Sequence, residues 1–415
     1  MKKIILLISA ALFMTGFTSC DPLEEEPVSS DKNPYKALSL STRQSEFVTT
    51  GQNFSLNFIN RVQMDSEKDY VISPLSMQFL LGMILDGTDN NTADQICNTL
   101  GYGKGEVKEV NEFCRTMMDQ LPKLDKNTKL AIANAIIVDE GWPLYDSYKK
   151  DVQKYYDAEV SNLDFSKTKE SAAKINKWCS DHTEGLIDKI LEETDPDMLA
   201  YLLNALYFKS VWSSPFDKDL SAKENFTFAD GKVDKVRMMK TERDMGYVKK
   251  EVCDAVRLPY SNGAFSMIVL RPMNGNGVSE VTKWLAKNGL EAVTNSIRER
   301  NVELWLPSFE TKFHINLNEI LAAMGMPDAF DGSKADFSKM SKYALCLSFV
   351  NQDAYIKVNE EGTEAAAISS AGVYKNTSVA IPEAPIIFHA DKPFLYLITE
   401  KSSGAILFAG RFSGK

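Results

Sequence analysis

The side chains that most often carry chemistry are sparse in this 415-residue sequence and fall in no catalytic pattern. The three histidines, His182, His314 and His389, lie outside any nucleophile-elbow or HExxH motif. Gly101–Gly105 is glycine-rich but lacks the apolar helix start of a dinucleotide site, so it is interpreted as a surface turn. The sequence therefore predicts no enzyme, no catalytic residue and no cofactor.

The six cysteines also point away from a metal centre, because none of them forms a CxxC pair or a metal-ligand spacing. Cys20 belongs to an N-terminal motif described below. The remaining cysteines are odd in number, which argues against a complete disulfide framework. We expect them to be buried free thiols: Cys97, Cys114, Cys179, Cys253 and Cys346.

One stretch, Glu360–Lys375, has a composition suited to a change of conformation. Its propensities allow a short helix capped by Thr363 and ended by Gly372, but that helix would have no apolar stripe to dock it. Read with the period of a strand, one face carries only small or uncharged side chains. That face consists of Thr363, Ala365, Ala367, Ser369, Ala371 and Val373. The segment is thus compatible with exposure in one state and insertion as a strand in another.

The start of this stretch resembles the hinge of the reactive-centre loop of inhibitory serpins. The residues that carry the resemblance are Glu360, Glu361, Gly362, Thr363, Glu364, Ala365, Ala366 and Ala367. Serpin loop insertion is a known example of strand addition. The sequence has no proline from Glu360 to Ala380, so an inserted strand would keep its backbone donors.

The resemblance implies a cleavage site near the end of the stretch. Family spacing counted from Gly362 leaves three candidates, Tyr374, Lys375 and Asn376. Lys375 is the only lysine or arginine between Lys357 and Lys392, so a trypsin-like protease has one obvious choice there. We predict the reactive bond Lys375–Asn376, with Tyr374–Lys375 as the alternate bond for a chymotrypsin-like or cathepsin-like enzyme.

Residues elsewhere resemble two serpin regions that control the opening of the main sheet. Ser73 and Ser76 begin an apolar helix, and Asn204 lies in a strand, as in the polar cluster called the shutter. Trp212 corresponds to the breach, where the loop enters the sheet. Most serpins have a histidine in the shutter where this chain has Gln352, and a neutral amide can still donate and accept there.

Further serpin-like blocks follow in the family's order, and the resemblance covers about residues 46–413. These blocks lie at 302–309, 335–338, 391–394 and 404–411. They imply an α+β serpin fold with three β-sheets surrounded by about eight or nine helices. The reactive-centre loop would be exposed and able to insert into the main sheet. We expect a single serpin domain over residues 46–415.

The N-terminus has the pattern of a targeting segment. Lys2 and Lys3 precede an apolar run too short to span a bilayer, and Thr18-Ser19-Cys20 follows. We predict a lipoprotein signal peptide over residues 1–19, with Cys20 as the lipidated first residue. Residues 20–45 are acidic and polar, as in a flexible tether. These features predict a cell-envelope lipoprotein, either at the outer-membrane surface or in the periplasm.

The formal charge of −10 argues against a nucleic-acid partner. The resemblance implies a monomeric suicide inhibitor of serine proteases, and also of cysteine proteases, that traps its target when the cleaved loop inserts. A trypsin-like protease and, through the lipid anchor, a membrane are the expected partners. The alternative is a non-inhibitory serpin acting as a surface binding module, although such proteins usually carry bulky, charged or proline residues in the hinge.

Overall fold

The computed structural model describes residues 33–65, 68–363 and 384–414, and all structural statements concern these residues. From Pro34 onward they belong to one unit. The helices are α1 (Thr42–Asp65), α2 (Pro74–Asp86), α3 (Asn90–Leu100), α4 (Val107–Gln120), α5 (Asp146–Tyr156), α6 (Thr168–His182), α7 (Val278–Asn288), α8 (Glu291–Thr294) and α9 (Asn318–Met324). Two short 3-10 turns are η1 (Leu121–Lys123) and η2 (Pro327–Phe330).

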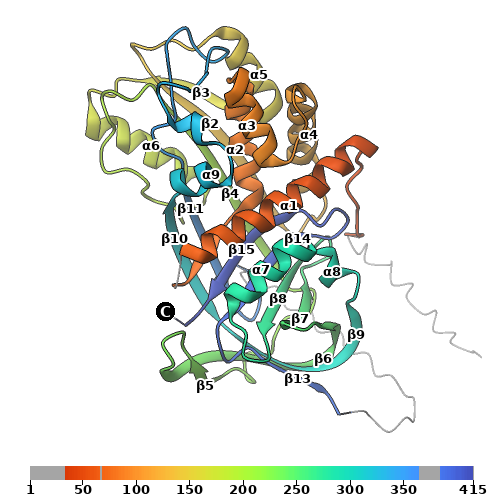
Figure 1. Ribbon diagram of the computed structural model, residues 1–415. Coiled ribbons are helices and arrows are strands. Elements are labelled where there is room, and N and C mark those ends of the chain that lie inside the picture. The colour runs from red at the N-terminus through yellow and green to blue at the C-terminus, as the bar shows by residue number, and fades with distance from the viewer. Residues whose placement is uncertain (1–32, 66–67, 364–383, 415) are drawn as a thin grey trace, which may run out of the picture. The chain divides into compact units, whose positions relative to one another are not determined.

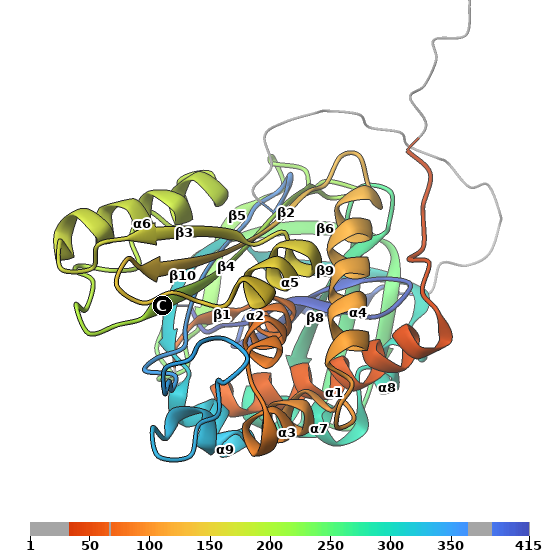
Figure 2. The same ribbon diagram turned by 90° about the horizontal axis from the view of Figure 1, so that it is seen from above.

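A six-stranded sheet carries the hinge. Its order is β10 (Phe309–Asn316), β11 (Asn351–Val358), β12 (Gly362–Thr363), β4 (Ala200–Val211), β2 (Lys129–Asp139) and β3 (Glu159–Leu163). The two-residue strand β12 is antiparallel to both of its neighbours, so β4 and β11 run parallel to each other. Helix α6 lies over one face of β2 and β4, and α2 packs against the other face (Figure 2).

A nine-stranded sheet forms the lower part of Figure 1, beside α7 and α8. Its order is β1 (Tyr70–Ile72), β15 (Ile406–Phe412), β14 (Phe394–Glu400), β8 (Phe265–Pro272), β7 (Cys253–Pro259), β6 (Val233–Lys249), β9 (Arg298–Pro307) and β13 (Ile386–His389). A further strand, β5 (Ala222–Thr227), pairs with β6. Two further sheets were expected from the sequence, besides the one that receives the loop. The long strand β6 pairs with β5, β7 and β9 and thereby joins all of these strands into a single sheet.

Helix α2 lies in the core between the two sheets. Residues from Pro74 to Leu85 are all buried, as expected for a helix that is apolar on every side. Ser73 caps its start by accepting a hydrogen bond from the Ser76 amide, and Pro74 occupies the first turn. The helix contacts β4 of one sheet and β15 of the other, so it packs on the face of the six-stranded sheet that is opposite to α6.

The described helices and two sheets form a mixed α+β structure, as expected. Helix α1 begins at Thr42, so it takes in the last residues of the segment expected to be a tether. Four of the five cysteines that follow Cys20 are buried free thiols, but the expectation of burial is wrong for Cys346, which is exposed in the irregular segment before β11. None of the described helices is long and apolar enough to cross a membrane.

Candidate functional site

The hinge begins as a tight turn between β11 and β12. The backbone of Asn359 exchanges hydrogen bonds with Gly362, and the Asn359 side chain accepts from the amides of Glu361 and Gly362 at 2.9 and 3.1 Å. This side-chain closure is typical of asparagine in turns. It directs the chain back on itself, so that Thr363 lies between Val358 of β11 and Ser210 of β4.

The turn is docked on the end of β4. The backbone amide of Trp212 donates to the Glu361 carbonyl at 2.8 Å, and its indole Nε1 donates to the Asn359 carbonyl at 2.9 Å. A Cβ at Gly362 would lie 2.1 Å from the carbonyl oxygen of Ser210, so only glycine fits there. These contacts fix the point at which the hinge enters the sheet.

Thr363 is already a core residue in this structure. It is 1 % exposed, and its hydroxyl lies 2.6 Å from the hydroxyl of Tyr260. Tyr260 in turn stacks on Trp212 with a ring separation of 4.4 Å. Burial raises the pKa of Tyr260 above its ordinary value, so the phenol remains neutral and can share a proton with Thr363.

The two hinge acids are neutralised by basic residues on neighbouring elements. Arg237 donates to Glu360 at 2.7 Å, and Lys218 pairs with Glu361. Burial acts to raise the pKa of Glu360, but hydrogen bonds from its own backbone amide and from Arg237 outweigh it, so the pKa lies below its ordinary value. Glu360 therefore stays ionised at neutral pH and holds the turn to β6.

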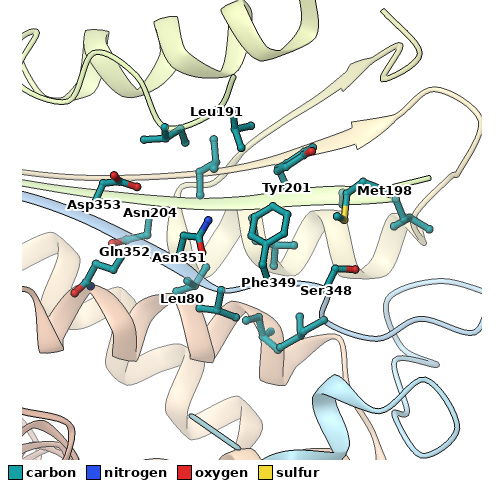
Figure 3. A pocket seen from close by; sticks show the side chains of 18 of the residues that line it. Leu80, Leu191, Met198, Tyr201, Asn204, Ser348, Phe349, Asn351, Gln352 and Asp353 are labelled. Atoms are coloured by element: carbon teal, nitrogen blue, oxygen red, sulfur yellow. The ribbon is translucent and has the colours of Figure 1, made fainter. Parts of the chain in front are cut away.

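Below β12, the described part of the sheet has no strand between β4 and β11. In the described part of the chain, β4 and β11 are joined only through the pairs that β12 makes with each, and no strand runs between them lower down. We call this space the β4–β11 gap. It holds a cavity of about 290 Å³, lined by side chains of β4, α2, β11 and the segment that precedes β11 (Figure 3).

The shutter residues meet below this gap. Gln352 donates from Nε2 to the Ser73 carbonyl and accepts from the Ser73 amide, both at 2.9 Å. The Ser76 hydroxyl donates to Oδ1 of Asn204. Both ends of the Gln352 amide are therefore used, as expected for a neutral replacement of histidine. Ser73, Ser76, Asn204 and Gln352 form one cluster, whereas Trp212 lies at the hinge turn.

A chain of buried and half-buried polar groups runs from this cluster to the far end of α2. Asn204 donates to Asn134 of β2 at 2.6 Å, and Asn134 donates to the Tyr156 carbonyl at 2.7 Å. The Tyr156 hydroxyl donates to Asn111 at 2.7 Å, and Asn111 donates to Asp86 at 2.6 Å. Burial raises the pKa of Asp86 to about 6, with a smaller opposing effect from Asn111.

This carboxylate gives a testable dependence of stability on pH. Because the folded pKa is raised, ionisation costs stability as the pH rises from about 4 to about 6 and throughout the range above. Asp86→Asn keeps an acceptor for Asn111 and removes this cost. Denaturant unfolding is expected to show the variant more stable by up to about 3 kcal/mol at pH 8, and equal to the wild type near pH 4. Asp119→Asn, which affects a partly exposed pair with Arg115, is the control and should change little.

The described residues include only part of the predicted site. Glu360, Glu361, Gly362 and Thr363 lie in and after the turn, but the rest of the hinge, the reactive bond and the lipidation site lie outside the described residues. That set is Glu364, Ala365, Ala366, Ala367, Tyr374, Lys375, Asn376 and Cys20. Sequence reasoning also missed Asn359, Tyr260 and Asn134. Of these, only Asn359 had a sequence signal, an asparagine three residues before a glycine.

Comparisons with known proteins agree with this geometry. The family model described as serpin (serine protease inhibitor) matches residues 49–414. The chain is 32% identical to serpin B6 of Macaca fascicularis over 368 residues, covering 87% of this chain and 97% of that protein. It is also 32% identical to serpin B9 of Homo sapiens over 369 residues, with the same shares covered.

Among solved structures, the thermophilic serpin tengpin in its native state superposes with a TM-score of 0.82 at 29% identity. The match covers 92% of this chain and 97% of tengpin. The family model extends from within α1 to the end of β15, so it takes in the hinge, the shutter residues and the gap. The chain belongs to the serpin family, a family of protease inhibitors.

Proposed function

We propose that this protein inhibits serine proteases, and cysteine proteases of similar specificity, by inserting its cleaved loop into the β4–β11 gap. The observation that carries the proposal is the two-residue antiparallel strand that lies between β4 and β11 at the top of the gap, below which no described strand separates them. The chain continues from that strand into a segment of small residues without proline. A strand that follows β12 would complete the ladder on both sides.

If the residues that follow Thr363 continued its pairing with β4 and β11, each of them would come between one residue of β4 and one residue of β11. This extended pairing tests whether the segment that begins at Glu364 fits the gap. On the core side, Ala365 comes between Phe208 and Ile356, which are 4 % and 2 % exposed, so a small side chain is needed there. Four residues later, Ser369 comes between Asn204 and Gln352 of the shutter. Both amides already have partners in the cluster, and a hydroxyl at that position can add a further hydrogen bond to either of them.

The outer side of the same strand is also complementary in charge. Its first residue, Glu364, comes between Lys209 of β4 and Lys357 of β11 in the extended pairing. Opposite charges on neighbouring strands stabilise a sheet by roughly 0.2–1 kcal/mol per pair. The alternation of the segment therefore agrees with the two faces of the gap, with apolar or hydroxyl groups inward and the acid outward.

The mechanism follows from a competition between two rates. The protease attacks the loop and forms its acyl-enzyme intermediate, which ordinarily hydrolyses. Cleavage frees the hinge, and about twelve residues at ~3.3 Å each carry the attached protease some 40 Å along the gap. Inhibition results when insertion deforms the protease before water completes hydrolysis. The starting fold must therefore be metastable and is consumed in one event.

The proposal is tested by incubating the protein with a panel of serine and cysteine proteases. We expect complexes that survive denaturing electrophoresis, together with a released C-terminal peptide whose first residue identifies the bond. Cleavage of the loop by every protease without a stable complex would contradict inhibition and would favour the non-inhibitory binding module instead.

Lys375→Ala tests the predicted reactive bond. A specificity pocket with a carboxylate at its base binds a lysine side chain and is left with an unpaired buried charge when that side chain is absent. The variant is expected to lose complexes with trypsin-like proteases and to keep those with proteases that cut after Tyr374. Tyr374→Ala is the matched control with the opposite pattern. If Lys375→Ala traps trypsin as before and releases the same peptide, the bond lies elsewhere.

Cys20→Ala tests the proposed anchor in the cell envelope. A single acyl chain binds a membrane only marginally, and lipoprotein processing would attach several to Cys20. The variant is expected in the soluble fraction of the cell, with its inhibitory activity unchanged. Recovery of the variant in salt-washed membranes would assign the anchor to another part of the chain.

A further inference from the structure

Aromatic side chains are exposed on the loop that joins β2 to α5. Trp142 and Tyr145 are each 39 % exposed, and they are two of the seven large hydrophobic side chains that are exposed in the described part of the chain. The Trp142 ring meets the Tyr343 ring edge-on, with centroids 4.7 Å apart. The exposed Lys342 lies over the Tyr343 ring, with its Nζ 5.2 Å from the centroid. We call Trp142, Tyr145, Lys342 and Tyr343 the aromatic patch.

The patch has a rigid base, because two segments that are distant in the sequence are tied together beneath it. The Tyr145 amide donates to the Met340 carbonyl at 2.9 Å, and the Ser341 hydroxyl donates to the Pro143 carbonyl at 3.2 Å. Met340 and Ser341 are both buried. The exposed rings are therefore fixed in place before binding, which lowers the entropic cost of covering them.

Exposed tryptophan and tyrosine on a rigid base are typical of a protein interface. Single exposed apolar residues are normal on a protein surface, whereas a contiguous group of them marks an interaction site. Tryptophan and tyrosine are also among the residues that most often carry binding energy once a partner covers them. The patch is thus suited to a protein partner, and its place in the fold indicates which one.

The patch lies at the end of the β4–β11 gap that is remote from β12. Strand β12 pairs with Ser210 near one end of β4, whereas the Asp139 amide, at the base of the patch loop, donates to the Leu199 carbonyl just before the other end. Met340 lines the cavity in the gap. Figure 1 shows α5, which follows the patch loop in the chain, at the opposite end of the fold from β13. The patch is therefore remote from both the hinge and β13.

The extended pairing gives the level that the reactive bond would reach after insertion. Lys375 follows Thr363 by twelve residues, and Met198 precedes Ser210, the β4 partner of Thr363, by the same number. Met198 adjoins the residue whose carbonyl is bonded to the base of the patch loop. A protease joined to Lys375 would therefore arrive beside this loop.

We propose that the aromatic patch is a docking surface for the captured protease. This inference rests on the proposed function and adds to it a second contact between the two proteins, besides the reactive bond. Before cleavage the protease stands at the opposite end of the fold, so the patch takes no part in recognition. After insertion the patch covers protease surface near the active site, because the acyl bond keeps that side of the protease turned toward the inhibitor.

Docking prolongs the trapped state. The acyl bond is hydrolysed when the deformed active site re-forms, and a surface that binds the displaced protease lowers the population in which this happens. Aromatic side chains at the centre of an interface commonly account for a large share of the affinity. Removing two of them is therefore expected to shorten the life of the complex about tenfold.

The first test measures the half-life of the purified complex from the return of protease activity. Trp142→Ser combined with Tyr145→Ser is expected to shorten it about tenfold, and the loss should fall on this half-life and not on the rate constant of association. Trp142→Phe keeps an aromatic surface and should retain most of the half-life. Met64→Ser, which removes a side chain of α1 that is 58 % exposed, is the control and should change nothing. If the double variant melts below the wild type, the two single variants decide the outcome.

The second test detects the contact directly. A photo-crosslinking phenylalanine analogue in place of Trp142 is expected to link to the protease in the covalent complex. It should not link to a protease whose nucleophilic serine is replaced by alanine, because that protease binds the loop without cleaving it and stays at the other end of the fold. The same analogue in place of Met64 should link to neither.

An unchanged half-life in the double variant, or equal cross-linking at position 142 to the active and the inactive protease, would overturn the docking surface. Self-association of the intact wild type that the double variant abolishes, with an unchanged half-life, would instead assign the patch to contact between copies of this chain. If the wild type forms no complex with any protease, the proposed function is wrong and the docking surface falls with it. The two failures are therefore distinguished by the wild type alone.

Discussion

Replacing Ala365 by arginine is expected to convert this protein from an inhibitor into an ordinary substrate. In the extended pairing the new guanidinium would lie between Phe208 and Ile356 on the core side of the sheet, without a carboxylate partner. Burying an unpaired charge costs several kcal/mol, and each 1.4 kcal/mol added to the insertion barrier slows it about tenfold. Hydrolysis of the acyl-enzyme is then faster than insertion, and the protease is released in its active form.

Ala366→Arg is the matched control, because the neighbouring residue faces outward and its side chain can reach solvent. Both variants are mixed with the trapping protease, and complex is measured against cleaved inhibitor on a denaturing gel. We expect almost only cleaved product from Ala365→Arg and a near wild-type ratio from Ala366→Arg. Thr363→Arg should also abolish trapping, but it removes the Tyr260 contact of the intact protein and is a less clean test. Stable complexes from Ala365→Arg at wild-type stoichiometry would contradict insertion.

The parts of the site that could be predicted were those in which one residue type has few alternatives. Gly362 was identified by its resemblance to the serpin hinge, and the structure gives the reason for a glycine there, since a Cβ would lie 2.1 Å from the Ser210 carbonyl oxygen. Ser73 marked the start of α2, since a serine is a strong helix cap, and the structure places Pro74 in the first turn that follows it. The alternation from Thr363 onward predicted a strand with a small inward face, and the contacts of Thr363 agree with that orientation.

The remaining parts of the site depend on contacts between residues that are far apart in the sequence, and such contacts could not be predicted. Asn134 lies 70 residues from its partner Asn204, and Tyr260 lies 103 residues from Thr363. Nothing local distinguishes such residues from other polar groups in apolar strands. The count of sheets likewise depended on β6, whose length and pairing on several strands join what were expected as separate sheets. The register between the hinge segment and strands β4 and β11 could not be predicted from the sequence either, although it determines which residue of that segment would lie beside the shutter cluster.

Cleavage of the loop is expected to raise the melting temperature of this protein, in contrast to the usual effect of a nick. A break in the chain ordinarily lowers stability, because the new ends gain freedom and local contacts are lost. Here the new end follows directly from β12, which already pairs with β4 and β11. Insertion would fill a cavity of about 290 Å³ and supply backbone partners along both sides of the gap.

Calorimetry or circular dichroism before and after limited proteolysis measures the effect. A net gain of about 4 kcal/mol corresponds to a shift of about 5 °C in the melting temperature of a domain of about 370 residues, and we expect at least that. A protease site engineered into the exposed turn Ala229–Lys232 between β5 and β6 provides a control nick, which should lower the melting temperature. If loop cleavage also lowers it, the gap does not accept the loop. The intact fold is then the stable one and has no stored energy with which to deform a protease.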